Sequence, residues 1–385
     1  MTSFRSQAES LFFLVAIFLL NFLSRVTLAP LMPMIEEELK IGHEGAGSLF
    51  FFVSLGYCTM VLGSGFVSSR LTHRKTIILS ALAVGGALMM IGITPSLWGI
   101  RLELILLGMA TGLYLPSGIS TITGLVSPKD WGKAIAIHEL APNLGYMIAP
   151  LLSEALLGWF SWRGVLVVLG IGSMLAAVVF SFFGKGGNFH GETPNSRVVR
   201  NILFEPTFWI MVTLFTLGIG ASLGVYAMIP LYLVSERGMD RTWANTLLGL
   251  SRVSTVGMVL LSGWVTDRLG PKQTLRVVFL SLGLTTIMLG VASESWIIIV
   301  VFLQPMITTW FFTPGFVALS RMGTPSTKNV VVAFTVPVGY LLGGGAIPAG
   351  IGFVGEVGSF SLAFTILGGL LLGGFVLVRY LKFID

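Results

Sequence analysis

Two arginines lie deep inside long apolar stretches of this 385-residue chain. Arg25 follows Asn21 by four residues, which places both side chains on one face of a helix, and Arg252 lies about nine residues into the apolar stretch that begins at Trp243. A guanidinium is planar and always charged, so it suits a carboxylate, sulfonate or phosphonate held by two parallel hydrogen bonds. The alternative is that each arginine pairs with a buried acid as a structural bridge.

A neighbouring imidazole and carboxyl group, His138 and Glu139, form the second candidate site. Such groups can exchange protons near neutral pH when they are desolvated or paired, so we interpret them as a proton site. The alternative is a satisfied polar contact near a helix end. The sequence has no metal-ligand spacing and no phosphate-binding glycine loop, and Cys58 is its one cysteine. It therefore predicts no enzyme, no catalytic residue, no metal site and no cofactor.

The composition is that of a membrane protein. Charged residues make up 10% of the chain and hydrophobic residues 54%, with a mean hydropathy of +0.90. A soluble domain carries about 25% charged residues. The net charge of +6 does not indicate a nucleic-acid partner, because the basic residues are scattered between the apolar stretches. The lipid bilayer is the expected surrounding of this chain.

Twelve apolar stretches are long enough to cross a bilayer, since a spanning helix needs about 20 mainly apolar residues. The first runs from Leu11 to Met34, the eighth from Trp243 to Val265 and the last from Phe360 to Tyr380. With both termini assigned to the cytoplasm, sixteen Lys and Arg residues fall inside and five outside, as the positive-inside rule requires. We therefore expect an all-α integral membrane protein with twelve transmembrane helices and both termini cytoplasmic. Short connections and the lack of an organelle signal favour a bacterial inner membrane.

An offset of 198 residues superposes matching residues from several predicted helices. The matched pairs are Gly65 and Gly263, Arg70 and Arg268, Arg74 and Lys272, Trp98 and Trp296, Pro116 and Pro314, and Pro150 and Pro348. One offset shared by several helix pairs indicates two homologous halves, as many transporters have. The sequence predicts two pseudo-symmetric six-helix bundles, residues 1–183 and 207–385, joined by a cytoplasmic linker, residues 184–206.

Two predicted cytoplasmic loops carry glycine and charged residues at matching positions. The loop after the eighth stretch has Gly263, Asp267 and Arg268, followed by Gly270 and Lys272, and it resembles the loop signature of the major facilitator superfamily. The loop after the second stretch keeps Gly65, Arg70 and Arg74 but has Ser69 in place of the acid and Thr72 in place of the second glycine. The alternative is that both loops are only positive-inside signals.

The resemblance implies a secondary transporter of the major facilitator fold. In that family, the loop charges hold the cytoplasmic helix ends together, so the expected cytoplasmic gate consists of Gly65, Arg70, Arg74, Gly263, Asp267 and Arg268. Family helices one, four, seven and ten line a central cavity, and helices two, five, eight and eleven flank it. The resemblance therefore lets Arg25 on the first helix and Arg252 on the eighth face one substrate. Helix position alone adds neutral candidates for the substrate site, for each of which helix packing is the alternative role: Asn21, Tyr114, Tyr226, Gln304 and Tyr340.

The combined interpretation is a monomeric carrier that moves a small organic anion by alternating access. Its expected partners are the anionic substrate, protons and the lipid bilayer. Proton-driven efflux of a drug-like or lipid-like compound is the alternative, in which the two arginines would be structural. A channel is less favoured, because two homologous halves with paired loop signatures indicate alternating access.

Overall fold

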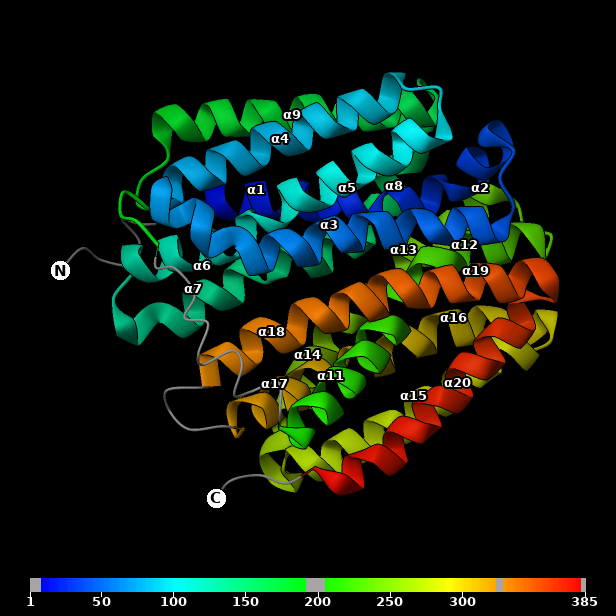
Figure 1. Cartoon of the computed structure of the whole chain (residues 1–385). Coiled ribbons are helices and arrows are strands. Elements are labelled where there is room, and N and C mark those ends of the chain that lie inside the picture. Colours follow the sequence, from blue (N-terminus) through cyan, green and yellow to red (C-terminus); the bar gives the residue numbers. More distant parts are fainter. Residues whose placement is uncertain (1–7, 192–204, 323–327, 382–385) are drawn as a thin grey trace. The chain divides into compact units, whose positions relative to one another are not determined.

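Helices make up almost all of the part of the chain that the structure describes. The structure is a computed structural model in which residues 8–191, 205–322 and 328–381 are described, so both termini and the middle of the predicted linker lie outside the described residues. In the first half of the chain the helices are α1 (Ala8–Val26), α2 (Leu28–Leu39), α3 (His43–Arg70), α4 (His73–Ile93), α5 (Leu97–Gly112), α6 (Tyr114–Leu125), α7 (Trp131–His138), α8 (Leu140–Leu157) and α9 (Trp162–Phe183) (Figure 1).

The second half of the chain is also helical and contains two π-helical segments. Its elements are α11 (Pro206–Ile219), η3 (Gly220–Gly224), α12 (Val225–Ser235), α13 (Arg241–Ser251), α14 (Thr255–Leu269), α15 (Pro271–Val291), α16 (Glu294–Thr309), α17 (Phe312–Ser320), α18 (Lys328–Leu341), η4 (Leu342–Ala346), α19 (Ile347–Val357) and α20 (Phe360–Leu377). The π-helical segments are η3 and η4, which join α11 to α12 and α18 to α19.

The described residues contain 11 helical stretches that are long and apolar enough to cross a membrane, against the twelve predicted. The difference lies at the predicted eighth stretch, which is broken into α13 and α14 at residues 252–254. Neither the 11-residue α13 nor the 15-residue α14 reaches the length of about 20 residues that one crossing needs. The chain is a multi-pass membrane protein, and its twelfth crossing remains a prediction that requires α13 and α14 to act together.

The helices form two compact units. The first comprises Met1–Leu31 and Phe52–Pro194, and the second comprises Met32–Phe51 and Asn195–Asp385. The second unit thus includes the end of α2 and the beginning of α3, which the sequence places in the segment 1–183. The predicted bundle boundaries coincide with helix ends, because α9 ends at Phe183 and α11 begins one residue before 207.

In each unit, two long helices pack closely through a pair of glycines. In the first unit, α4 lies beside α9, and in the second, α15 lies beside α20 (Figure 1). A Cβ on Gly85 or Gly170 would meet the carbonyl oxygen of the other glycine, and the same holds for Gly283 and Gly368. The second glycine pair follows the first by 198 residues. This agreement extends the repeat from sequence to packing, since small residues allow membrane helices to approach closely.

Gly368→Ala is expected to destabilise the second unit by about 1–3 kcal/mol, because its new methyl group would lie 2.7 Å from the carbonyl oxygen of Gly283. Gly369→Ala is the matched control, since nothing lies within 4 Å of a Cβ there. Thermal unfolding of the detergent-purified variants, followed by circular dichroism, measures the effect. Equal midpoints for the two variants would contradict this packing.

Candidate functional site

Several residues of the predicted substrate and proton sites lie next to an interruption in a helix. Proline has no N–H for the carbonyl four residues earlier, and its ring clashes with that carbonyl, so a proline can open a helix just before it. Prolines 33, 150, 230, 305 and 337 lie inside continuous helices without such a break. Four interruptions lie three residues before a proline: Thr27 before Pro30, Leu113 before Pro116, Glu139 before Pro142, and Phe311 before Pro314. The carbonyl of Trp310, which Pro314 cannot serve, accepts a hydrogen bond from Ser262 at 3.1 Å. Backbone irregularities therefore occur beside Arg25, Tyr114 and His138.

Arg25 lies near the middle of the stretch Ala8–Leu39, in the first unit. Its side chain is buried at 5% exposure among aromatic rings. The guanidinium carbon is 4.4 Å from the centre of the Tyr57 ring and 5.2 Å from that of Phe22. Phe22 in turn meets the edge of the Tyr146 ring, with ring centres 4.9 Å apart. Cation–π contacts of this kind stabilise a desolvated guanidinium through its face. The N–H groups of a guanidinium lie at its edge, where a planar acceptor binds.

Asn21 hydrogen-bonds to the backbone of another helix. Its side-chain Nδ2 donates a hydrogen bond to the backbone carbonyl of Thr111 at 3.2 Å, which ties α1 to the end of α5. The hydroxyl of Ser24 donates to the backbone carbonyl of Asn21 at 2.7 Å. The structure thus gives Asn21 a packing contact, and its role as a substrate ligand remains a prediction.

Arg252 lies at the break between α13 and α14, in the second unit. No proline follows Arg252 within four residues, so a proline does not explain this interruption. The side chain is 6% exposed, and its guanidinium carbon is 4.9 Å from the centre of the fully buried Tyr226 ring. The hydroxyl of Thr255 donates to the carbonyl of Arg252 at 2.7 Å, which caps the break.

A small cavity of about 10 Å³ borders Arg252. It is lined by Arg252, Gln304, Ser251, Pro305 and apolar residues of α12, α13, α15 and α16. Gln304 donates from Nε2 to the carbonyl of Ala221, inside the π-helical segment η3, at 2.8 Å. The volume suffices for about one water molecule. The structure therefore brings two predicted site residues, Arg252 and Gln304, to one small cavity with a mainly apolar lining. Tyr340 is half-buried on α18, directly before the second π-helical segment.

His138 is fully buried in a stack with Phe18 and Tyr114. The Phe18 ring lies 4.3 Å from the imidazole and 5.2 Å from the Tyr114 ring, nearly parallel to both. The Tyr114 hydroxyl donates to the carbonyl of Leu14 at 2.6 Å, because a carbonyl can only accept. Nε2 of His138, 3.0 Å from the same hydroxyl oxygen, must then be the donor in that contact.

This tautomer decides the chemistry of the next contact. With hydrogen on Nε2, a neutral imidazole has only a lone pair on Nδ1, which lies 3.3 Å from Oε1 of Glu139. Two acceptors cannot bond, so the contact is favourable when a proton sits on one of the two groups. Glu139 lies at the interruption between α7 and α8, and its side chain is 49% exposed. The pair therefore has one buried member, His138, and one half-exposed member, Glu139.

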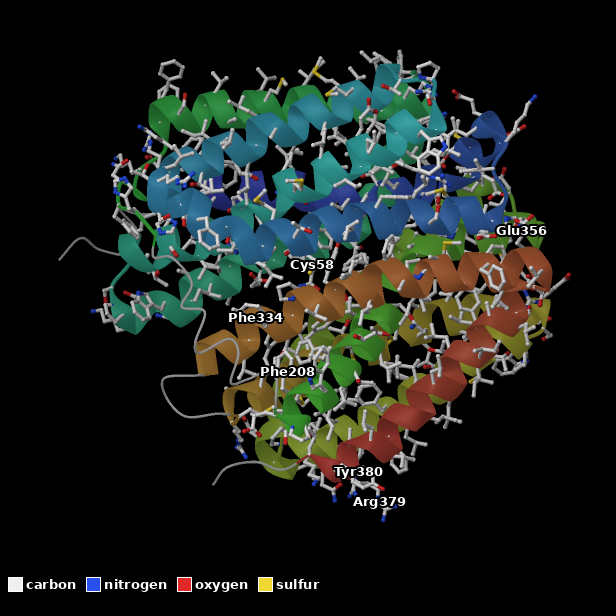
Figure 2. All side chains as sticks on the ribbon, in the orientation of Figure 1. Cys58, Phe208, Phe334, Glu356, Arg379 and Tyr380 are labelled. Carbon is white, nitrogen blue, oxygen red and sulfur yellow. The ribbon has the colours of Figure 1, made fainter. Side chains whose placement is uncertain are left out.

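The predicted gate residues are split between capping and exposed positions. Arg74 donates to the carbonyls of Ser181 at 3.0 Å and Phe180 at 3.3 Å and to that of Gly184, so it caps the end of α9. Lys272 donates to the carbonyls of Arg379 at 2.9 Å and Leu381 at 2.7 Å, at the end of α20 that Figure 2 shows with Arg379 and Tyr380. These caps are equivalent in the repeat, because Ser181 and Arg379 are also 198 residues apart.

The remaining gate residues lie at the surface of their units. Arg70, Asp267 and Arg268 are exposed, and the Arg268 guanidinium covers the Trp264 ring at 4.0 Å. No ion pair of Asp267 is found within the described part of the chain. Gly65 is half-buried on α3, and a Cβ on Gly263 would meet nothing within 4 Å. The gating role of these residues remains a prediction.

Sequence reasoning missed two features near these sites. The aromatic partners Tyr57, Tyr146 and Phe18 come from tertiary packing, although Phe18 and Phe22 do precede Arg25 at helical spacing. The start of the predicted linker, at residues 187–189, also hydrogen-bonds to the beginning of α4, directly after the loop that follows α3. The N–H groups of His73 and Arg74 donate to the carbonyls of Phe189 at 3.0 Å and Gly187 at 2.8 Å. Gly187 adopts a φ of 74°, which favours glycine.

The sequence matches the Major Facilitator Superfamily over residues 14–341. It is 24% identical over 277 residues to the probable sulfoacetate transporter SauU of Cupriavidus necator, across 66% of this chain and 63% of that protein. It is 21% identical over 302 residues to the membrane sensor protein UhpC of Escherichia coli, across 71% and 66%. A multi-drug resistance efflux pump PmrA homolog of Lactococcus lactis is 26% identical over 259 residues, across 63% and 62%. The chain thus spans less than two thirds of the length of each of these relatives.

Solved structures share the fold over nearly the whole chain. A bacterial homolog of the human lysosomal transporter Spinster, in an inward-facing and occupied conformation, superposes with a TM-score of 0.79 at 16% identity, covering 98% of this chain and 96% of that one. The nucleoside transporter NupG superposes with a TM-score of 0.80 at 13% identity, covering 96% and 99%. At these identities the likeness concerns the fold alone.

Proposed function

Because the chain belongs to the Major Facilitator Superfamily, we propose that this transporter carries a small organic anion of the carboxylate, sulfonate or phosphonate class, coupled to protons. Arg25 and Arg252 bind the anionic group, and Glu139 with His138 holds the coupling proton. The main support for this proposal is that each unit contains one buried arginine, at most 6% exposed, whose guanidinium packs on a tyrosine ring beside a helix break. These pairs are Arg25 with Tyr57 and Arg252 with Tyr226.

The chemistry of the two arginines supports an anionic substrate. A buried charge in a membrane is costly, so it is retained where it has a function. The faces of both guanidiniums are occupied by aromatic rings, and their edges suit the two oxygens of a carboxylate or sulfonate. Helix interruptions beside binding residues are common in transporters, because opened backbone can line a polar cavity. The likeness to a probable sulfoacetate transporter points to the same substrate class.

Efflux of a drug-like compound is the second candidate function. The likeness to a multi-drug resistance efflux pump homolog favours it, as do the aromatic rings around Arg25. In this case the arginines would hold the helices together, and the rings would contact the substrate. A cationic or neutral apolar compound would then be transported in place of an anion.

Uptake into proteoliposomes distinguishes these functions. A panel of carboxylates, sulfonates and phosphonates, together with cationic drugs, is offered without a proton gradient, with an inwardly directed one and with an outwardly directed one. We expect saturable uptake of at least one anion, increased by the inward gradient, and none of the cations. Uptake of cationic drugs alone, driven by the outward gradient because a proton-driven efflux pump exchanges its substrate for protons, would establish the efflux alternative. A sustained single-channel current would indicate a channel.

Tyr57→Leu is expected to raise the half-saturating anion concentration about three- to tenfold, since it removes the ring beneath Arg25. A cation–π contact contributes about 0.5–2 kcal/mol, depending on desolvation. Tyr380→Leu is the matched control, because Tyr380 is 64% exposed in the short 3-10 helix Val378–Tyr380 that follows α20. Initial uptake rates against anion concentration provide the measurement, and identical values for both variants would contradict the role of Tyr57.

A further inference from the structure

The tip of the connection between α2 and α3 packs against α19 within the second unit. A Cβ on Gly47 would meet the carbonyl oxygen of Pro348, and a Cβ on Gly352 would meet that of His43. The backbones of α3 and α19 are therefore in direct contact at these glycines. This end of the second unit is its predicted outer end, and Figure 2 labels Glu356 there, on the last turn of α19.

Three titratable residues meet at this packed end. Nδ1 of His43 lies 2.7 Å from Oε1 of Glu36, at the end of α2. The backbone N–H of His43 donates to Oε2 of Glu356 at 2.5 Å. The imidazole also packs against Phe360, with ring centres 4.8 Å apart. His43 is thus held between one carboxylate from α2 and another from α19, and its side chain is only 25% exposed.

Other charged groups on the surrounding elements have different contacts or lie at the surface. Glu37, Glu38, Lys40 and Glu44 are exposed around the same connection. Glu236 accepts hydrogen bonds from the N–H groups of Phe360 and Ser361 and so caps α20. Arg241 on α13 contacts the sulfur of Met34 at 3.0 Å. The charges that act on Glu36 are those of His43 and Glu356, and Glu356 repels it.

We propose that Glu36, His43 and Glu356 form a proton-binding site that fastens the α2–α3 connection to α19. A proton on His43 gives a cation between two carboxylates, which attracts both. Loss of that proton leaves the carboxylates of Glu36 and Glu356 near each other beside a neutral His43, and their repulsion loosens the contact. Proton binding therefore favours the packed arrangement. The site deepens the proposed proton coupling but is separate from the pair His138 and Glu139, which lies in the first unit.

Spin-label distances in the purified, substrate-free protein test this site. Labels at Glu44→Cys and Val357→Cys, with Cys58→Ala as background, report on the contact by pulsed electron paramagnetic resonance at pH 5.5 and pH 8.5. We expect a single short distance at the lower pH. At the higher pH, the ratio of longer to short distances rises about tenfold, within the usual range of such couplings.

Two conservative variants identify the groups responsible. His43→Gln keeps the backbone N–H and removes the titrating ring, and Glu36→Gln removes one carboxylate charge. Each is expected to abolish the pH response, whereas His190→Gln, at an exposed histidine of the first unit, leaves it intact. A parent protein without a pH response, or a response that persists in both Gln variants, would overturn the proposal. Because no substrate is present, this result does not depend on whether the chain transports an anion.

Discussion

Arg252→Lys is expected to raise the half-saturating concentration of the transported anion about 10- to 100-fold. Lysine keeps the positive charge but loses the planar fork that holds two oxygens at once. One hydrogen bond to a charged group contributes about 1.5–3 kcal/mol, and every 1.4 kcal/mol corresponds to a tenfold change. The ammonium group is also too compact to cover the Tyr226 ring and reach an anion at the same time.

Initial uptake rates in proteoliposomes at matched protein density measure this effect. Arg379→Lys is the control, because Arg379 is exposed at the end of α20 and only its backbone carbonyl is used, by Lys272. Arg25→Lys should behave as Arg252→Lys does if both arginines contact the anion. Normal anion uptake by both buried-site variants would exclude anion binding by these arginines, and the anion would then have to bind elsewhere in the chain.

Glu139→Gln is expected to abolish accumulation driven by a proton gradient while leaving anion exchange across the membrane. Glutamine resembles the protonated acid and cannot release a proton, so the carrier can still reorient but cannot couple. With one proton per anion, a gradient of one pH unit supports about tenfold accumulation, since one pH unit corresponds to about 1.36 kcal/mol. We expect this ratio to fall to near one.

Paired measurements of accumulation and counterflow exchange in the same vesicles separate coupling from general inactivation. His138→Gln tests the buried member of the pair, and Glu294→Gln at an exposed position is the control. If Glu139→Gln accumulated the anion as the parent does, the coupling proton would have to be held elsewhere. The titratable cluster of Glu36, His43 and Glu356 would then be the next candidate.

The family and the repeat could be predicted from the sequence, because both depend on short residue patterns: the loop signature and the matching residues 198 positions apart. The 198-residue offset found from loop and proline residues also relates the caps made by Arg74 and Lys272. It relates the glycine contacts between the paired long helices in the same way. Apolar length predicted the helices, since a membrane-spanning segment must satisfy its own backbone hydrogen bonds.

The interruptions within helices were only partly predictable. Prolines 30, 116, 142 and 314 are visible in the sequence, and each explains a break three residues earlier. The break at Arg252 and the π-helical segments η3 and η4 have no such signal. Hydropathy predicted one continuous eighth helix, because α13 and α14 together are apolar enough to cross a membrane. The backbone between them, at residues 252–254, is not helical.

The neighbours of the buried polar residues could not be derived from spacing. Arg25 was correctly identified as a buried charge, yet the ring at its face, Tyr57, comes from α3. Asn21 shares the helical face predicted for it but hydrogen-bonds to the backbone of Thr111 on α5. Helical periodicity defines which side chains share a face, whereas the partner across that face depends on how separate helices pack.

Equilibrium binding to the purified protein tests whether the two buried arginines hold an anion. Isothermal titration with sulfoacetate and a panel of carboxylates, phosphonates and cationic drugs should give saturable binding of at least one anion. Arg25→Lys and Arg252→Lys should each weaken that binding at least about tenfold, and Arg379→Lys should not. Binding of a cationic drug with no binding of any anion, or anion binding unchanged in both buried-arginine variants, would contradict the proposed site.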